Sequence, residues 1–203
     1  MEYQVRKARA TDVGQVYGLL KRLAAEGLLL PRSYSSLYEM LQTLYVAESG
    51  GGAGGIIVGA GALQVSWEDL AEVRSLCVAE GFRGCGVGRA ITAAIEADAR
   101  ELAIRRMFAL TYVPEFFFRL GYRQVSLDSL PQKVWAVCFS CVHYPDCREI
   151  AVVKELDPVV SGTVSGPDPR VALAEGAVPA VLPGAPVGSL ACIVRPGAGG
   201  VKP

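Results

Sequence analysis

A glycine-rich turn is the segment whose residue types and spacing point most directly to chemistry. It lies between a strand-like run, Glu72–Val78, and a run of apolar residues at helical spacing. A turn that opens a helix leaves several backbone N–H groups without an intrahelical acceptor, and the helix dipole adds partial positive charge. The turn is therefore predicted to bind a diphosphate, although an ordinary strand-to-helix turn would have the same composition. The predicted ligands are Arg83, Gly84, Cys85, Gly86, Val87, Gly88 and Arg89.

Two common nucleotide-binding motifs are excluded by the spacing of this turn. A Walker loop requires a Lys-Ser or Lys-Thr pair after its last glycine, whereas Gly88 is followed by Arg89 and Ala90. A dinucleotide fingerprint has the spacing G-x-G-x-x-G in the first strand–helix unit. Here the spacing is G-x-G-x-G, and several strands with an antiparallel pattern precede it. The turn therefore indicates neither a P-loop protein nor a Rossmann fold.

A second group of reactive side chains lies near the predicted last strand. Cys138, Cys141, His143 and Cys147 form the pattern C-x2-C-x-H-x3-C. Thiolates and imidazole suit zinc. All four residues lie in one short loop, however, without the second distant pair that zinc sites usually have. We therefore favour reduced thiols and assign no metal ligand, with a metal site as the alternative.

The composition is typical of a soluble globular protein. The 203 residues are 51% hydrophobic, which is ample for a core. With 20 basic and 20 acidic residues, no global field favours nucleic acid or anionic lipid as a partner. Charges occur within the first dozen residues, and no run of roughly 18 uncharged apolar residues is present. We expect a cytoplasmic protein with no membrane or nucleic-acid partner.

Residues 1–156 alternate strand-like and helix-like stretches that would position the turn. The first predicted helix follows Thr11 as a cap, and the second follows Ser33, Ser35 and Ser36 as candidate caps. A third helix extends from the glycine turn with Ile91, Ala94, Ile95 and Leu102 on one face, and a short one spans Pro114–Leu120. The predicted strands are Tyr3–Ala8, Tyr45–Glu48, Ile56–Trp67, Glu72–Val78, Met107–Tyr112, Tyr122–Ser126 and Glu149–Leu156. Gly50–Gly55 is expected to join the second and third strands as a hairpin.

Residues 157–203 have a different character. They contain eight prolines, eight glycines and no aromatic residue. Such a segment buries little apolar surface, so we expect a disordered or loosely attached extension. The apolar stretches Val178–Leu182 and Leu190–Val194 leave a docked strand as the alternative.

The order of elements, the R-G-x-G-x-G turn after the fourth strand and the later Leu120-Gly121-Tyr122 resemble the GCN5-related N-acetyltransferase superfamily. More narrowly, residues 1–156 resemble the acetyltransferase domain of bacterial N-acetylglutamate synthases, the first enzyme of arginine biosynthesis. The motifs that carry this match are Leu30-Pro31-Arg32-Ser33, residues 71–78 (AEVRSLCV), residues 107–111 (MFALT) and residues 129–133 (SLPQK). The resemblance implies an α/β (α+β) fold with a mixed, mostly antiparallel central sheet and helices on both faces. It also implies acetyl-CoA as co-substrate, with its pyrophosphate on the glycine turn.

The same resemblance implies roles for residues on the fourth strand. Glu72 takes the position of the general base that deprotonates the acceptor amine, although an exposed strand-edge carboxylate is the other reading. The pantetheine arm would lie beside the backbone of Leu76, Cys77 and Val78, where strand pairing is expected to end after Val78. The N–H of Cys77 is the expected donor to the thioester carbonyl.

Basic residues and a hydroxyl complete the implied site. The substrate carboxylates are expected to contact Arg32, Arg74 and Lys133, with Arg74 on the face of Glu72 unless a bulge intervenes. Many relatives have a tyrosine as the acid four residues before the glycine equivalent to Gly121, but here that residue is Phe117. Thr111 is therefore the first candidate for the acid and Tyr112 the second, with a plain strand threonine as the alternative.

L-glutamate is the acceptor that the resemblance favours. Another small amine, a protein N-terminus, or a non-catalytic coenzyme-A-binding module are the alternatives, and a homodimer is left open. The sequence begins at the first strand, without the amino-acid-kinase domain that binds arginine in longer synthases. That difference puts feedback inhibition by arginine in doubt.

Overall fold

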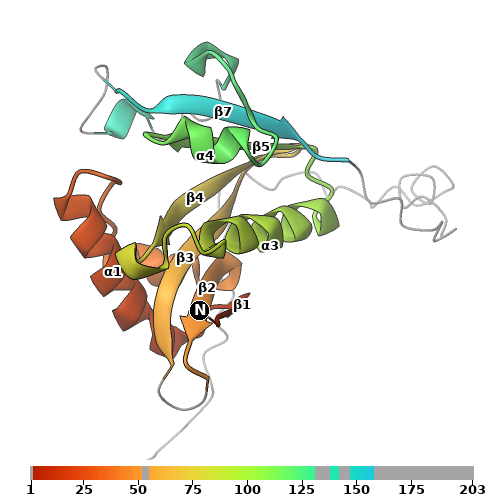
Figure 1. Ribbon diagram of the computed structural model, residues 1–203. Helices are drawn as coiled ribbons and strands as arrows, with labels where there is room; N and C mark the ends of the chain where they lie inside the picture. Colours follow the sequence, from red (N-terminus) through yellow and green to blue (C-terminus); the bar gives the residue numbers. More distant parts are fainter. Residues whose placement is uncertain (1, 52–54, 131–137, 142–146, 158–203) are drawn as a thin grey trace, which may run out of the picture. The chain divides into compact units, whose positions relative to one another are not determined.

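The computed structural model describes residues 2–51, 55–130, 138–141 and 147–157. Lys133, His143 and the extension from residue 158 lie outside these ranges. In the described part the strands form one mixed sheet in the order β1-β2-β3-β4-β5-β7-β6 (Figure 1). The strands are β1 (Gln4–Lys7), β2 (Leu44–Ser49), β3 (Ile56–Trp67), β4 (Leu70–Val78), β5 (Arg106–Thr111), β6 (Arg123–Gln124) and β7 (Ile150–Glu155). Only the β4–β5 pair is parallel, which confirms the predicted mostly antiparallel sheet.

Helices cover both faces of this sheet, as predicted (Figure 1). The helices are α1 (Val13–Ala25), α2 (Tyr34–Glu39), α3 (Val87–Glu101) and α4 (Pro114–Phe118). Alternate residues of β2 show the two faces: Leu44 and Val46 pack with α1 and α2, whereas Tyr45 and Ala47 pack with α3. None of the helices that the structure describes is both long enough and apolar enough to cross a membrane.

Two glycines in β3 set how closely α3 approaches the sheet. A Cβ atom on Gly59 would lie 2.8 Å from Val87 Cγ1, and one on Gly61 would lie 2.9 Å from Ile91 Cγ2. Real Cβ atoms do not come so close to other carbons, so only glycine permits this packing. The first turn of α3 therefore lies directly against the backbone of β3.

Several predicted helix details were wrong. Thr11 is exposed and does not cap α1; Asp12 accepts the N–H of Arg9 at 2.7 Å and the guanidinium of Arg6 at 2.6 Å. Leu102 follows the end of α3 and is exposed, because the apolar face of the helix ends one turn earlier. Ser33 does cap α2, accepting the N–H of Ser36 at 3.1 Å.

A bulge in β4 and an early end to its parallel pairing open the sheet at one place. The β3–β4 register shifts by one residue where Ser75 has φ +54°, a conformation that side-chain-bearing residues rarely adopt. Only Leu70–Glu72 of β4 pairs with β5. The separation expected after Val78 thus begins already after Glu72, and it leaves one edge of residues 73–78 unpaired with β5.

Candidate active site

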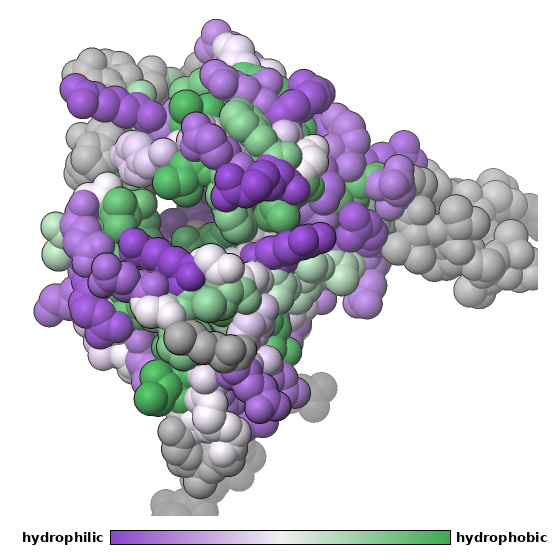
Figure 2. All heavy atoms as spheres, in the orientation of Figure 1, coloured by the Kyte–Doolittle hydropathy of each residue, from purple (hydrophilic) through white to green (hydrophobic). Residues whose placement is uncertain are grey.

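The gap between β4 and β5 is the site of a cavity of about 860 Å³. Figure 2 shows a recess bordered by hydrophilic and hydrophobic residues on this face of the molecule. Every predicted site residue that the structure describes lines the cavity, apart from Cys85. Those residues are Arg32, Glu72, Arg74, Leu76, Cys77, Val78, Arg83, Gly84, Gly86, Val87, Gly88, Arg89, Thr111 and Tyr112. The fold thus brings together residues from four separate segments of the chain.

The glycine turn has the backbone geometry that an anion requires. Gly84 and Gly86 have φ +78° and +84°, values that favour glycine. Arg83 and Cys85 donate their N–H groups within the turn, and the first helical bond is from Ala90 to Gly86. Among the residues that the structure describes, none accepts the N–H groups that follow Gly86, at positions 87–89. These amides are therefore available to a diphosphate, whereas two earlier ones are already bonded.

The open edge of β4 presents N–H groups of Leu76 and Val78, and not that of Cys77. Ala79 donates its N–H to Val58 of β3 at 2.8 Å, and Cys77 pairs with Ala60 in the same register. Because backbone groups alternate in direction along a strand, the N–H of Cys77 faces β3. Its expected role as donor to a thioester carbonyl is therefore corrected in favour of its two neighbours.

Glu72 and Arg74 lie on the same face of β4, because the bulge begins only at Ser75. Glu72 Oε2 is 3.4 Å from Arg74 Nε, and the Glu72 residue is only 6% exposed. Arg74 Nη1 donates to Gln64 Oε1 at 3.4 Å. Arg74 Nε is buried, and apart from this ion-pair contact with Glu72 it makes no hydrogen bond within the described part of the chain. A buried donor of this kind is costly unless a ligand accepts from it.

Arg32 reaches this pair from the segment before α2. Its Nε donates to Ser75 Oγ at 3.0 Å, so the bulge positions the guanidinium. Burial lowers the pKa of Arg32 below its usual value, and the positive charge of Arg74 adds to the lowering. Glu72 and Glu149 oppose this shift. Two like charges are thus held close together at one end of the cavity, which favours an anionic ligand between them.

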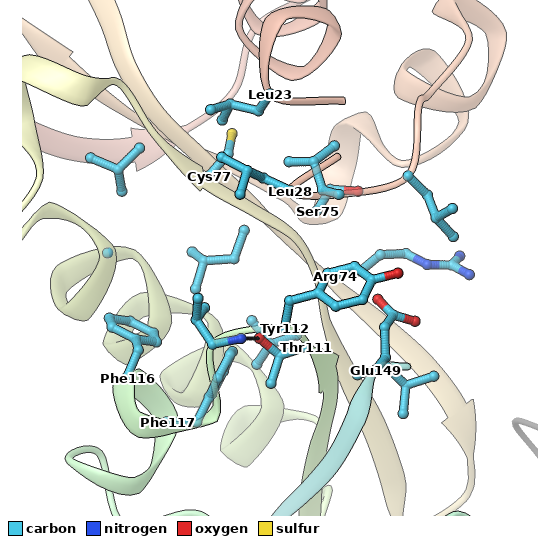
Figure 3. Close-up of a pocket in the computed structure, with 18 of the residues that line it drawn as sticks. Leu23, Leu28, Arg74, Ser75, Cys77, Thr111, Tyr112, Phe116, Phe117 and Glu149 are labelled. Atoms are coloured by element: carbon cyan, nitrogen blue, oxygen red, sulfur yellow. Dashed lines mark hydrogen bonds between the residues drawn. The ribbon is translucent and has the colours of Figure 1, made fainter. Parts of the chain in front are cut away.

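Thr111 ends β5 and is 8% exposed. Its Oγ1 accepts the N–H of Val113 at 3.0 Å, as the dashed line in Figure 3 shows. Phe117 packs edge-on against the rings of Phe116 and Tyr122. The residue in the position of the family's tyrosine therefore belongs to the core, and it brings no hydroxyl to the cavity.

Tyr112 and Glu149 lie beside Arg74, at the end of the cavity that Arg32 and Glu72 also line (Figure 3). Burial raises the pKa of Tyr112, and the carboxylate of Glu149 raises it further. Sequence reasoning missed Glu149 as a site residue, because no local motif marks it. Its position could have been inferred only from the pairing of β5 with β7, which brings Glu149 opposite Tyr112.

The cysteine-rich segment also reaches the cavity. Cys138, Cys141 and Cys147 line it as free thiols. Within the described ranges, no group of three or more Cys, His, Asp or Glu side chains has an arrangement that could hold a metal ion. The predicted ligand His143 lies outside those ranges.

Comparisons with known proteins agree with this geometry. A family model described as an acetyltransferase (GNAT) domain matches residues 41–124. An uncharacterized N-acetyltransferase of Chlorobaculum tepidum is 36% identical over 152 residues, which cover 75% of this chain and 96% of the relative. An amino-acid acetyltransferase of Mycobacterium tuberculosis is 39% identical over 121 residues, which cover 60% of this chain and 68% of the relative.

Two solved structures are similar to this fold. A Mycobacterium tuberculosis protein in complex with CoA and NLQ is 30% identical with a TM-score of 0.64, covering 76% of this chain and 99% of that protein. N-acetylglutamate synthase from Neisseria gonorrhoeae, complexed with coenzyme A and N-acetyl-glutamate, is 26% identical with a TM-score of 0.68. That match covers 77% of this chain but 36% of the synthase. The chain belongs to the GCN5-related N-acetyltransferase (GNAT) superfamily and is an N-acetyltransferase with acetyl-CoA as its co-substrate.

Proposed function

We propose that this enzyme acetylates the α-amine of L-glutamate to N-acetylglutamate, the first step of arginine biosynthesis. The observation that carries the proposal is the pair of guanidinium groups, Arg32 and Arg74, beside the buried carboxylate of Glu72. Glutamate has two carboxylates, and arginine favours planar, bidentate contacts with such groups. The relatives named amino-acid acetyltransferase support an amino-acid acceptor, and the neighbouring synthase was solved with N-acetyl-glutamate.

Glu72 is the proposed general base. The α-amine of an amino acid is protonated at neutral pH and must lose a proton before it attacks, directly or through water. Acetyl-CoA supplies the thioester, whose diphosphate is proposed to bind the amides after Gly86. The N–H groups of Leu76 and Val78 are the proposed donors to the thioester carbonyl.

The leaving thiolate needs a proton or a hydrogen bond, and Thr111 is the proposed hydrogen-bond donor, with solvent supplying the proton. Its oxygen already accepts the N–H of Val113, so its own hydrogen is directed to another acceptor. Tyr112 is the second candidate: its raised pKa keeps the hydroxyl neutral and able to donate, but makes it a weaker acid. Lys133 as a carboxylate ligand, a cytoplasmic location and a homodimer stay predictions.

The test is an acceptor panel. Release of the coenzyme A thiol would be measured with each of the standard amino acids, a polyamine and a peptide with a free N-terminus. We expect the highest kcat/KM with L-glutamate and a product with the mass of N-acetylglutamate. Aspartate and D-glutamate are the matched controls, because they change the spacing or the handedness of the same charges. A higher kcat/KM with the polyamine or the peptide would overturn the proposal.

A further inference from the structure

The pairing of β5 with β7 places Glu149 at the end of the cavity lined by Arg32, Glu72 and Arg74, called the acceptor end below because the acceptor is proposed to bind there. Thr111 pairs with Ile150, so the next residues in the same register, Tyr112 and Glu149, lie across from one another where the two strands end. Glu149 lines the same cavity as Glu72, and Figure 3 shows its carboxylate beside Tyr112 and Arg74. Three neighbouring strands thus present an arginine, a tyrosine and a glutamate at one opening.

The Glu149 carboxylate accepts a hydrogen bond from a neighbouring thiol and interacts electrostatically with the charged groups of the site. The thiol of Cys147 donates to Glu149 Oε2 at 3.7 Å. The negative charges of Glu72 and Glu149 both oppose the lowering of the Arg32 pKa, so both carboxylates lie near its guanidinium. The described acceptor end therefore contains two arginines and two carboxylates.

The second carboxylate has no role in the mechanism so far. One carboxylate is enough for a general base, and a further negative charge would repel the carboxylates of glutamate. The acceptor carries one cation, its α-ammonium, which must bind before it can be deprotonated. A carboxylate at the same end of the cavity as the arginine pair satisfies that need, because charge-assisted hydrogen bonds are stronger than neutral ones.

We propose that Glu149 binds the α-ammonium group of the acceptor and orients the amine toward Glu72, while Arg32 and Arg74 bind carboxylate. This role for Glu149 rests on the proposed function, and it specifies which groups of the acceptor the site recognises. The site selects ligands with an ammonium group next to a carboxylate, and it discriminates against dicarboxylates that have no amine. Glu149 is a positioning residue for the amine, distinct from the base that removes its proton.

Glu149→Gln tests this role, because it keeps the shape of the side chain and removes the charge. We expect KM for L-glutamate to rise about 10-fold or more, the loss expected for one charge-assisted hydrogen bond, with a smaller fall in kcat because the amine is less well oriented. KM for acetyl-CoA should not change. Glu149→Asp should restore part of the affinity. The control is Glu155→Gln, an exposed carboxylate at the other end of the same strand.

Glutarate, which is glutamate without its amine, separates the ammonium contact from other roles. In Glu149→Gln its inhibition constant should stay unchanged or fall, while KM for glutamate rises. Equal weakening of both ligands would indicate a structural role and overturn the proposal, and so would tighter binding of both. If the wild-type enzyme fails to acetylate glutamate, the proposed function fails on its own. The same comparison, made with the preferred acceptor and its deaminated analogue, then decides the role of Glu149.

Discussion

Arg32 Nε donates a hydrogen bond to Ser75 Oγ, which joins the segment before α2 to the bulge in β4. The contact fixes the guanidinium beside Arg74 and leaves its other N–H groups for a ligand. Arg32→Lys keeps the charge but loses the planar fork, so KM for glutamate should rise about 10-fold or more with kcat little changed. Ser75→Ala removes only the orienting hydroxyl and should raise KM about two- to tenfold. Steady-state kinetics check both, and an unchanged KM in Arg32→Lys would contradict the carboxylate contact.

Removing the base should slow turnover without affecting coenzyme A. Glu72→Gln is expected to lower kcat by about 10²–10⁴, the usual contribution of general base catalysis. Because the base is then missing, the rate of the variant should rise as pH approaches the pKa of the free α-amine. Calorimetric titration with coenzyme A should give the wild-type affinity. Glu68→Gln, an exposed carboxylate in the turn before β4, is the control. Wild-type turnover in Glu72→Gln would remove Glu72 from this role.

The hydroxyl of Thr111 accepts the N–H of Val113 and is the proposed donor to the leaving thiolate, and two substitutions test this role. Thr111→Ser keeps the acceptor for Val113 and the donor, so it should retain most of the activity. Thr111→Val loses both, and kcat should fall about 10-fold or more if the hydroxyl donates a hydrogen bond to the leaving thiolate. A thermal melt of each variant measures the structural part of the loss. If Thr111→Val lowers the melting temperature but not kcat, the threonine only supports the end of β5.

The left-handed conformation of the glycine turn predicts a selective loss of co-substrate affinity. Gly86→Ala forces a side chain into φ +84°, which costs about 1–2 kcal/mol, so KM for acetyl-CoA should rise severalfold. Gly81→Ala is the matched control, since Gly81 is exposed, has no positive φ and has open space around it. KM for glutamate should be similar in both variants. Equal KM values for acetyl-CoA would show that the turn does not carry the diphosphate.

The thiols of the chain should differ sharply in their reaction with an alkylating agent. Burial raises the pKa of Cys77 to about 12, so at pH 8 only about one thiol in ten thousand is the reactive thiolate. Thiolate grows as pH rises toward the pKa, so Cys77 should react only at high pH or after unfolding. Cys85 is exposed in the glycine turn and should react readily. Peptide mass spectrometry measures the labelling of each thiol, and equal labelling of Cys77 and Cys85 in the folded protein at pH 8 would contradict the burial of Cys77.

The strands were the most predictable part of the fold, because their side-chain pattern is local. Ile56–Trp67 was predicted to the residue, since β-branched residues and flanking turn signals define it. The strand expected at Tyr122–Ser126 has only two residues, because a short 3-10 turn begins at Leu127 and Tyr122 packs in the core. Thr11 was the wrong cap, since the buried ion pair of Asp12 with Arg6 decides how that helix begins.

The site was predictable in its residues but not in its geometry. The resemblance pointed to Glu72 and Arg32, and the structure places both on one cavity. The conformation of Ser75 could not be predicted, because serine carries no sequence signal for a positive φ. The position of Glu149 in the site depends on the pairing of two strands that are almost forty residues apart in the sequence, and no local sequence pattern indicates such a pairing.

Gly59 and Gly61 have a consequence for the length of the molecule that fits the cavity. They let the first turns of α3 pack against the backbone of β3. The strand β3 also pairs with β4 on both sides of the bulge. The anchor for a diphosphate and the open strand edge are therefore held by a single strand at a fixed separation. Because these two glycines fix that separation, we expect a shorter or longer thioester carrier to place its carbonyl carbon away from the amine that Glu72 is proposed to deprotonate.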